Sequence, residues 1–268
     1  MEHLVETIVL GVVQGLTEWL PISSTGHLRL FENFFRLKVP ILFDVILHAG
    51  TLVVVLIFFR KDLRDILSRP HGNIQFGEKN VISLIVVGTI PTIVVGLIFG
   101  SIIEDTFKTS LPIGIAFLLC GALLYLSKKR RENIHGVTFS TAFLIGVAQG
   151  VAIIPGISRS GFTIATALLI GIKQEQAFKF SFLLSIPTLL GAMGYTIATE
   201  VGELSASGIG WVEMLSGVVV AIISGYFTLK LLWRTLAQGR FHLFAFYCWS
   251  LGLLLVLWEI FQPTWFVI

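Results

Sequence analysis

GVVQGLTEWLPISSTGH, residues 11–27, leads from an apolar helical pattern directly into a cluster of polar side chains. A second stretch, GVAQGVAIIPGISRSGF at 146–162, repeats this order of residues at a constant offset. Aligned in this way, the first stretch matches the second at Gly11, Gln14, Gly15, Ile22, Ser23 and Gly26, which correspond to Gly146, Gln149, Gly150, Ile157, Ser158 and Gly161. Most matched residues are polar or glycine, not the common Leu and Val, so chance similarity explains them poorly. The chain is therefore predicted to contain an internal repeat.

The composition indicates the solvent in which these stretches lie. Of 268 residues, 55% are hydrophobic and 13% charged, and the mean hydropathy is +0.89. A soluble protein of this length needs more charge to cover its surface, so the sequence predicts a polytopic membrane protein. The net charge of +3 gives no indication of a nucleic-acid partner, and none is expected. Cys120 and Cys248 lie in apolar runs and are interpreted as small core residues.

Hydrophobic stretches predict an all-α fold, because a bilayer core of about 30 Å is crossed by about 20 helical residues. Six stretches qualify as spans: 42–59, 80–103, 111–127, 177–199, 211–233 and 241–261. The regions 4–20 and 138–154 are apolar but carry polar groups, and each continues through a Ser-rich stretch into a shorter segment, at 28–38 and 161–172. This order predicts two re-entrant helical hairpins, whose polar tips are tolerated at membrane depth only inside protein or beside a wet cavity.

Three spans follow each hairpin, and an odd number of spans inverts the second half relative to the first. We therefore expect a single membrane domain, 1–268, built from two inverted-topology repeats at about 1–127 and 138–261. Most of the 19 Lys and Arg residues fall on the side that holds 60–79 and 128–137. The positive-inside rule places that side in the cytoplasm, so both termini are expected outside. The first hairpin then enters from outside and the second from inside, and their polar tips are expected to meet near the middle of the bilayer.

The first hairpin tip concentrates ionisable groups that are costly in a membrane and hence functional candidates. Gln14 and Glu18 are four residues apart on one helix face, and Ser24 and His27 follow at the same depth. A structural ion pair is the alternative for Glu18, and a satisfied core histidine is the alternative for His27.

The second tip, PGISRSGFT at 155–163, predicts an anion site at a helix N-terminus. Its hydroxyl groups and the forked guanidinium of Arg159 suit phosphate, although the serines could merely cap the helix and Arg159 could snorkel. Together the two tips favour phosphoryl chemistry, with anion transport as the second interpretation. Asp44 and His48 could line the same cavity, and a helix-terminal structural pair is at least as plausible for them.

The two motifs resemble the signatures of the undecaprenyl-diphosphate phosphatase family, the bacitracin-resistance type of integral membrane phosphatase. The resemblance extends over nearly the whole chain, including FDVILHAGTL and FSFLLSIPT (180–188). It implies hydrolysis of undecaprenyl diphosphate to undecaprenyl phosphate, the lipid carrier of bacterial wall synthesis, at a site open to the outer face of the plasma membrane. The rival function is a secondary transporter or flippase for a polyprenyl phosphate or another anion, because inverted repeats with broken helices also occur in transporters.

The resemblance also implies roles for individual residues. Glu18 matches the second acid of the family's first motif, Ser24 its proposed nucleophile, His27 its histidine and Arg159 its phosphate-binding arginine, and these four are the expected catalytic residues. His27, helped by Glu18, is expected to act as general base on Ser24 or on a water. Substrate contacts are expected from Gln14, Ser23, Thr25, Gly26, Ser158, Ser160, Gly161 and Thr163. A divalent cation, Mg²⁺ or Ca²⁺, is expected to bridge Glu18 and the phosphates. Gln14 stands where many members have Glu, so a metal site with two carboxylates is in doubt.

Overall fold

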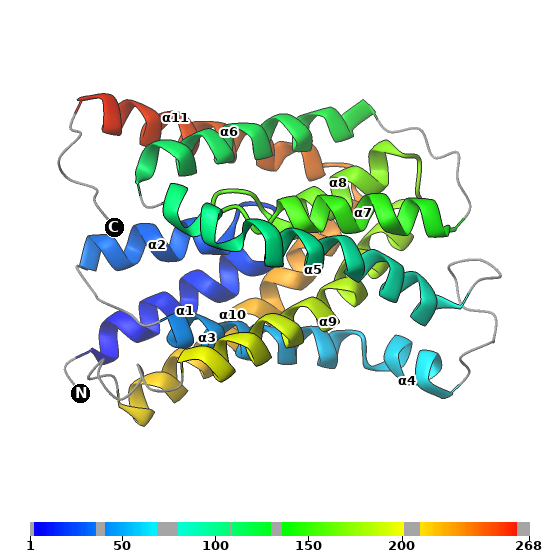
Figure 1. The fold of residues 1–268 in the computed structure, drawn as a ribbon, viewed down its shortest axis with the longest axis horizontal. Helices are drawn as coiled ribbons and strands as arrows, with labels where there is room; N and C mark the ends of the chain where they lie inside the picture. Colours follow the sequence, from blue (N-terminus) through cyan, green and yellow to red (C-terminus); the bar gives the residue numbers. More distant parts are fainter. Residues whose placement is uncertain are drawn as a thin grey trace.

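The protein is a bundle of α-helices, in which the computed structural model describes residues 3–35, 41–68, 80–107, 109–129, 136–200 and 210–261 (Figure 1). In chain order the helices are α1 (Leu4–Trp19), α2 (Ser24–Phe35), α3 (Ile41–Phe58), α4 (Arg60–Ser68), α5 (Val81–Thr106), α6 (Ser110–Leu126), α7 (Phe139–Val151), α8 (Arg159–Leu169), α9 (Gln174–Glu200), α10 (Trp211–Ala237) and α11 (Phe244–Phe261). Two 3-10 turns, η1 (Ser127–Lys129) and η3 (Phe241–Leu243), complete the described ranges, and no β-strand occurs within them. The predicted all-α class is confirmed.

Five helices are long and apolar enough to cross a membrane alone: α5, α6, α9, α10 and α11. The sixth predicted span is α3, which meets α4 at a bend of 70°. Because α4 carries the charged sequence RKDLRDILS, it leaves the direction of the span and buries little beyond Ile66. The prediction of about six spans in a polytopic membrane protein is confirmed. The remainder of the predicted loop, 69–79, lies outside the described residues.

Both predicted hairpins are pairs of short helices, α1 with α2 and α7 with α8. The first helix of each pair has 16 or 13 residues, fewer than the roughly 20 that cross a bilayer. α1 ends before Pro21, which holds Leu20 in an extended conformation (φ −66°, ψ 148°). In the second hairpin Gly156 has a φ of +96°, which only glycine adopts without strain. The short helices begin at Ser24 and Arg159, earlier than the predicted 28 and 161, so the serine stretches lie in or beside their first turns.

Each hairpin packs against a helix from the other half of the chain. α1 runs along α10, and α7 runs along α5, while α6 and α11 lie side by side (Figure 1). Glycines permit these approaches: a Cβ on Gly11 would lie 2.3 Å from the Gly217 carbonyl oxygen, and one on Gly146 would lie 2.0 Å from that of Gly88. Two inverted repeats would produce this arrangement, in which the hairpin of each half packs against a long helix of the other half. The repeat boundaries themselves stay a prediction.

Gly146→Ala is expected to lower the unfolding temperature in detergent by about 5 °C, because its Cβ would force apart the backbones of α5 and α7 at a cost of about 1–3 kcal/mol. Gly100→Ala on α5 is the matched control, since nothing lies within 4 Å of its added Cβ. We expect the control to be neutral or stabilising. Thermal unfolding followed by circular dichroism compares the two, and an equal effect of both substitutions would contradict the close-approach argument.

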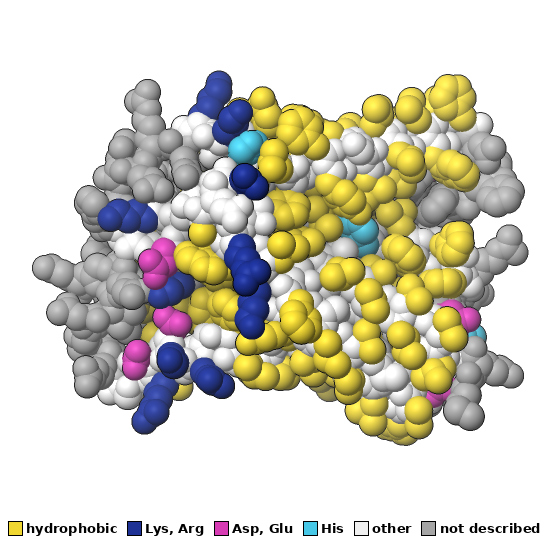
Figure 2. All heavy atoms as spheres, turned by 180° about the vertical axis from the view of Figure 1, so that it is seen from behind, with side chains coloured by type: hydrophobic (Ala, Val, Ile, Leu, Met, Phe, Trp, Pro, Cys, Tyr) yellow, Lys and Arg dark blue, Asp and Glu magenta, His cyan; other side chains and the backbone are white. Residues whose placement is uncertain are grey.

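The surface divides into an apolar belt and a charged end. Figure 2 shows hydrophobic side chains over most of one face and Lys and Arg side chains gathered towards one end of the molecule. Connectivity brings the end of α3, the end of α6, the start of α9 and the end of α10 to one end of the bundle. The described basic residues there are Arg60, Lys61, Arg64, Lys128, Lys129, Lys173, Arg234 and Arg240. The charge asymmetry used to predict orientation is therefore present in the folded molecule.

Candidate active site

The two hairpin tips contact each other inside the bundle. Ser23 Oγ accepts a hydrogen bond from the Gly156 N–H at 3.1 Å. In return, Ser158 Oγ donates to the Leu20 carbonyl at 3.3 Å, and Ser160 Oγ donates to that of Trp19 at 3.0 Å. Each broken helix thus satisfies backbone groups of the other, which is the condition for non-helical backbone at membrane depth.

Glu18 is the centre of the polar network that this contact creates. Its side chain is buried, and its Oε1 forms a salt bridge with the Arg159 guanidinium. Its Oε2 accepts from Ser24 Oγ at 2.5 Å and from Gln14 Nε2 at 3.1 Å, and it lies 3.3 Å from His48 Nε2. A buried carboxylate is tolerated only with such partners. The predicted association of Gln14, Glu18, Ser24 and Arg159 is therefore present.

Arg159 is the first residue of α8, where the helix dipole is positive. Ser158 caps the helix by accepting from the Gly161 N–H at 3.1 Å. The guanidinium lies 5.9 Å from the centre of the Trp19 ring, which supports one of its faces. Only one nitrogen, Nη2, bonds to Glu18, so further N–H groups of the fork can bind an anion.

A cavity of about 250 Å³ opens beside these groups. It is lined by Glu18, Ser23, Ser24, Thr25, Val45, His48, Ala152, Ile153, Ile157, Ser158, Arg159, Leu189, Ala192 and Met193. The volume is smaller than that of sites for drug-sized ligands, which begin near 300 Å³. A diphosphate-sized polar group fits such a space, whereas a long apolar chain does not.

His27 lies outside this lining. Its Nδ1 is 2.7 Å from the Ser23 carbonyl oxygen and its Nε2 is 2.6 Å from the Tyr247 hydroxyl. The ring stacks on Tyr247 and meets Phe117 edge-on, with centroids 5.7 Å and 5.5 Å away. His27 therefore ties the first tip to α6 and α11, and the structure does not bring it to Glu18 as the sequence suggested.

Several other predicted substrate contacts lie away from the cavity and stabilise the packing of the two tips. Thr163 Oγ1 donates to the Arg159 carbonyl at 2.8 Å, which steadies the first turn of α8. An added Cβ on Gly26 would lie 2.8 Å from Phe117, and one on Gly161 would lie 3.1 Å from Pro21. With Ser160, these residues pack the two tips together and do not line the cavity. Of the predicted contacts, the lining includes Ser23, Thr25 and Ser158.

His48 is the site residue that sequence reasoning left undecided. It lines the cavity and reaches Glu18 from α3, and Thr51, one turn further on, accepts from Gln14 Nε2 at 3.4 Å. Asp44 contributes its backbone carbonyl to His48 Nδ1 at 2.7 Å. The available signal was an ionisable side chain within an apolar span in FDVILHAG, which is a functional indication in its own right.

A resident metal ion does not fit the side chains at Glu18. Within the described ranges no group of three His, Cys, Asp or Glu side chains is placed to hold one. Both Glu18 oxygens already accept from N–H or O–H donors, and Gln14 turns its amide nitrogen, not its oxygen, towards that carboxylate. Mg²⁺ and Ca²⁺ need six or more oxygen ligands. The protein alone does not supply this donor set.

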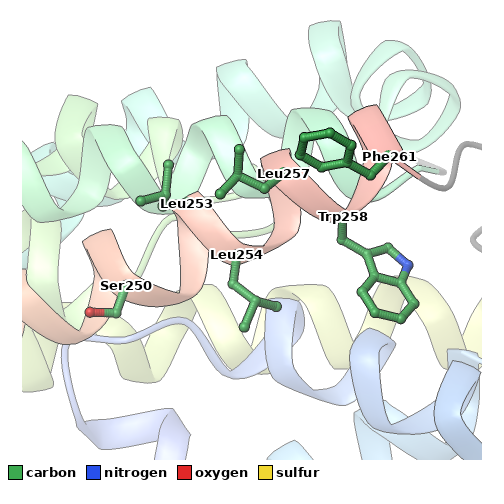
Figure 3. Close-up of a pocket in the computed structure, with 6 residues that line it drawn as sticks. All are labelled: Ser250, Leu253, Leu254, Leu257, Trp258 and Phe261. Carbon is green, nitrogen blue, oxygen red and sulfur yellow. The ribbon is translucent and has the colours of Figure 1, made fainter.

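A larger hollow, of about 570 Å³, lies along α11 and carries no comparable chemistry. It is lined by Ser250, Leu253, Leu254, Leu257, Trp258 and Phe261, which Figure 3 shows along the helix with Leu254 and Trp258 on one side of it. This lining is typical of a surface that faces hydrocarbon. The smaller, polar cavity is therefore the candidate active site.

Broken helices that meet inside a helical bundle around Ser24, Glu18 and Arg159 define a polytopic membrane protein with a buried cluster of charged and polar side chains. A family model, described as bacitracin resistance protein BacA, matches residues 7–254. The chain belongs to this family.

Curated relatives are similar over almost their full length. A protein from Carboxydothermus hydrogenoformans named "Undecaprenyl-diphosphatase" is 41% identical over 252 residues, covering 92% of this chain and 94% of the relative. A protein of the same name from Halothermothrix orenii is 39% identical, covering 95% and 98%. "Undecaprenyl-diphosphatase 4" from Bacillus thuringiensis strain Al Hakam is also 39% identical, covering 94% and 95%.

Proposed function

We propose that the protein is a membrane phosphatase that hydrolyses undecaprenyl diphosphate to undecaprenyl phosphate and inorganic phosphate. Its family and the names of its relatives support this activity. The observation that carries it is that one carboxylate, Glu18, joins a hydroxyl, Ser24, to a guanidinium, Arg159, at the wall of a small polar cavity. The released lipid phosphate would return to cell-wall synthesis as its carrier, and removal of the diphosphate would agree with the family's description as a bacitracin resistance protein.

Binding of the diphosphate begins with Arg159. The terminal phosphate takes the free N–H groups of the guanidinium and lies at the positive end of α8, beside Ser158. A doubly charged phosphate on these N–H groups draws on the positive charge of Arg159, while Nη2 keeps its contact with Glu18. Less of that charge then stabilises the carboxylate, which becomes a better proton acceptor.

Ser24 is the proposed nucleophile, because its hydroxyl already donates to Glu18 Oε2. Glu18 takes the hydroxyl proton as Ser24 Oγ attacks the terminal phosphorus, and Arg159 neutralises charge on the transferred phosphoryl group. His27 positions the tip, since its Nδ1 bonds to the carbonyl of Ser23, the residue before Ser24. Thr25 and Ser23 lie in the cavity wall and offer hydroxyls to the phosphates.

We further propose that the divalent cation enters with the diphosphate and is held mainly by phosphate oxygens and water. Mg²⁺ is commonly bound in this way, with one or two carboxylates and the substrate as ligands. No step above depends on it. Bound, it would add positive charge beside the leaving phosphate.

Phosphate release by the purified protein in detergent tests the function. Polyprenyl diphosphate should yield one inorganic phosphate per lipid phosphate, while Glu18→Gln, which retains the size of the side chain but not the base, should release almost none. A wild-type protein that binds the lipid yet releases no phosphate would contradict the proposed function and favour a transporter or flippase.

We propose that the protein lies in the bacterial plasma membrane with the cavity open to the outer face. The predicted orientation places Thr106 at the end of α5 outside and Ser68 at the end of α4 inside. In a variant with Cys120→Ala and Cys248→Ala, a single Thr106→Cys should react with a membrane-impermeant thiol reagent on intact cells. Ser68→Cys should react only after lysis. Both positions are exposed, so the reverse pattern would overturn the orientation.

A further inference from the structure

We propose that His48, not His27, is the histidine that donates a proton to the leaving lipid phosphate. The inference rests on the proposed function and assigns a catalytic residue on a helix, α3, outside both serine motifs. It is carried by three observations: the hydrogen bonds of His48, its position in the cavity wall, and the different partners of His27.

The contacts of the two ring nitrogens of His48 indicate which of them carry protons. Its Nδ1 lies 2.7 Å from the Asp44 carbonyl oxygen, which can only accept, so Nδ1 carries a proton. Its Nε2 lies 3.3 Å from Glu18 Oε2. That carboxylate already accepts from Arg159, Ser24 and Gln14 and has no proton of its own to give. We therefore assign a proton to Nε2 as well, which makes His48 an imidazolium ion in the proposed mechanism.

The place of this ion suits proton donation. His48 lines the same cavity as Ser24 and Arg159, and 19% of its side chain is exposed there. Ser24 Oγ and His48 Nε2 both point at Glu18 Oε2 from neighbouring parts of the wall. Ser24 Oγ and His48 Nε2 are therefore less than 6 Å apart, so the bridging oxygen of a phosphate that Ser24 attacks in line can lie within hydrogen-bond reach of His48.

His27 has no proton to offer to the cavity. Its Nδ1 faces the Ser23 carbonyl oxygen, and its Nε2 faces the Tyr247 hydroxyl, which can donate to it. A neutral ring satisfies both contacts, and the ring is held between Phe117 and Tyr247 behind the tip. His48 and His27 therefore differ in access to the cavity and in whether their partners require a second ring proton.

The reaction balances with these groups. Ser24 Oγ forms a bond to the terminal phosphorus and gives its proton to Glu18, while the bond from phosphorus to the bridging oxygen breaks. The leaving lipid phosphate takes the Nε2 proton of His48. A water molecule then attacks the phosphoserine and returns a proton to His48, and Ser24 Oγ recovers its proton from Glu18 as inorganic phosphate leaves. One group thus acts as acid and then as base.

His48→Gln tests this role, because the glutamine amide can still donate to Glu18 but cannot release a proton. On farnesyl diphosphate we expect kcat/KM, which reports the steps up to formation of the phosphoserine, to fall on the order of 10²-fold, the usual contribution of a general acid. On an analogue with sulfur in place of the oxygen between the two phosphorus atoms, we expect kcat/KM to fall less than about threefold. Sulfur leaves without protonation, so the missing acid is no longer needed.

Equal losses on both substrates, or no loss on the oxygen substrate, would overturn the proposal. His242→Gln at η3, near the opposite end of α11 from Phe261, controls for loss of a histidine and should change neither rate. Should the glutamine variant unfold, His48→Met fills the same space without a dissociable proton and is expected to give the same contrast. A wild-type protein that releases no phosphate from undecaprenyl diphosphate would instead contradict the proposed function itself.

Discussion

Arg159→Lys is expected to lower kcat/KM for polyprenyl diphosphate on the order of 10³-fold while the protein stays folded. Lysine keeps the positive charge and can still pair with Glu18, so the buried carboxylate is not left alone. It lacks the planar fork that contacts Glu18 and a phosphate oxygen at the same time. Charge that develops on the transferred phosphoryl group then loses its placed donors, and removal of one such donor costs about 10²–10³ in rate.

The measurement is phosphate release over a range of substrate concentrations, with thermal unfolding in detergent as the test of folding. Arg234→Lys, at an exposed position in the last turn of α10, is the matched control and should leave kcat/KM unchanged. If the Arg159 variant turned over at nearly the wild-type rate, Arg159 would serve only as a structural point charge. The phosphate site would then have to be sought elsewhere.

The sequence predicts the contact between Arg159 and Glu18 because of the repeat and not because of proximity along the chain. The residues are 141 positions apart, and only two inverted hairpins whose tips meet bring them together. The helical period likewise predicts that Gln14 and Glu18 share a face, and the structure shows their hydrogen bond. Repeated polar residues in an apolar chain are thus sufficient evidence for the core of the site.

The choice between two histidines could not be made in the same way. His27 is three residues from Ser24, so the sequence favours it as the partner of Glu18. In the folded chain its ring turns to Tyr247, which is 220 positions away on α11, and this packing has no signal in either motif. His48 arrives from α3, and its direction depends on how that helix packs beside α1 and α10. The spacing of residues along the chain does not determine how packed helices orient these two side chains.

The starts of α2 and α8 were also predicted too late. Serine, threonine and glycine interrupt the apolar helical pattern, so the sequence predicts that the short helices begin only after the polar stretch. Ser158 instead caps α8 by accepting from the Gly161 N–H, and Ser23 accepts from the Gly26 N–H in the first turn of α2. The earlier start makes Arg159 the first residue of α8, where the helix dipole is positive.

Ser24→Ala is expected to abolish phosphate release, with a fall in kcat on the order of 10⁴-fold or more, because removal of a nucleophile leaves only binding and charge stabilisation. The hydroxyl is buried and bonded to Glu18, so alanine removes one donor from a carboxylate that keeps Arg159, Gln14 and His48. The variant should therefore fold and bind substrate. Ser23→Ala is the comparison variant. It removes the acceptor of the Gly156 N–H and should lower the stability of the hairpin tips, but it keeps the Ser24 nucleophile and is therefore expected to retain measurable turnover.

A phosphoserine intermediate gives the decisive observation for the nucleophile. Rapid acid quench of wild-type protein with excess substrate, followed by mass spectrometry of the peptide that contains residues 21–30, should find phosphate on Ser24 within the first turnover. With the sulfur analogue, His48→Gln should accumulate more of it, because phosphoserine forms without the acid while activation of the attacking water still lacks its base. The Ser24→Ala protein should carry none. If wild type shows no phosphoserine and Ser24→Ala retains substantial activity, water attacks the diphosphate directly, and Ser24 serves to hold Glu18 and the incoming phosphate in place.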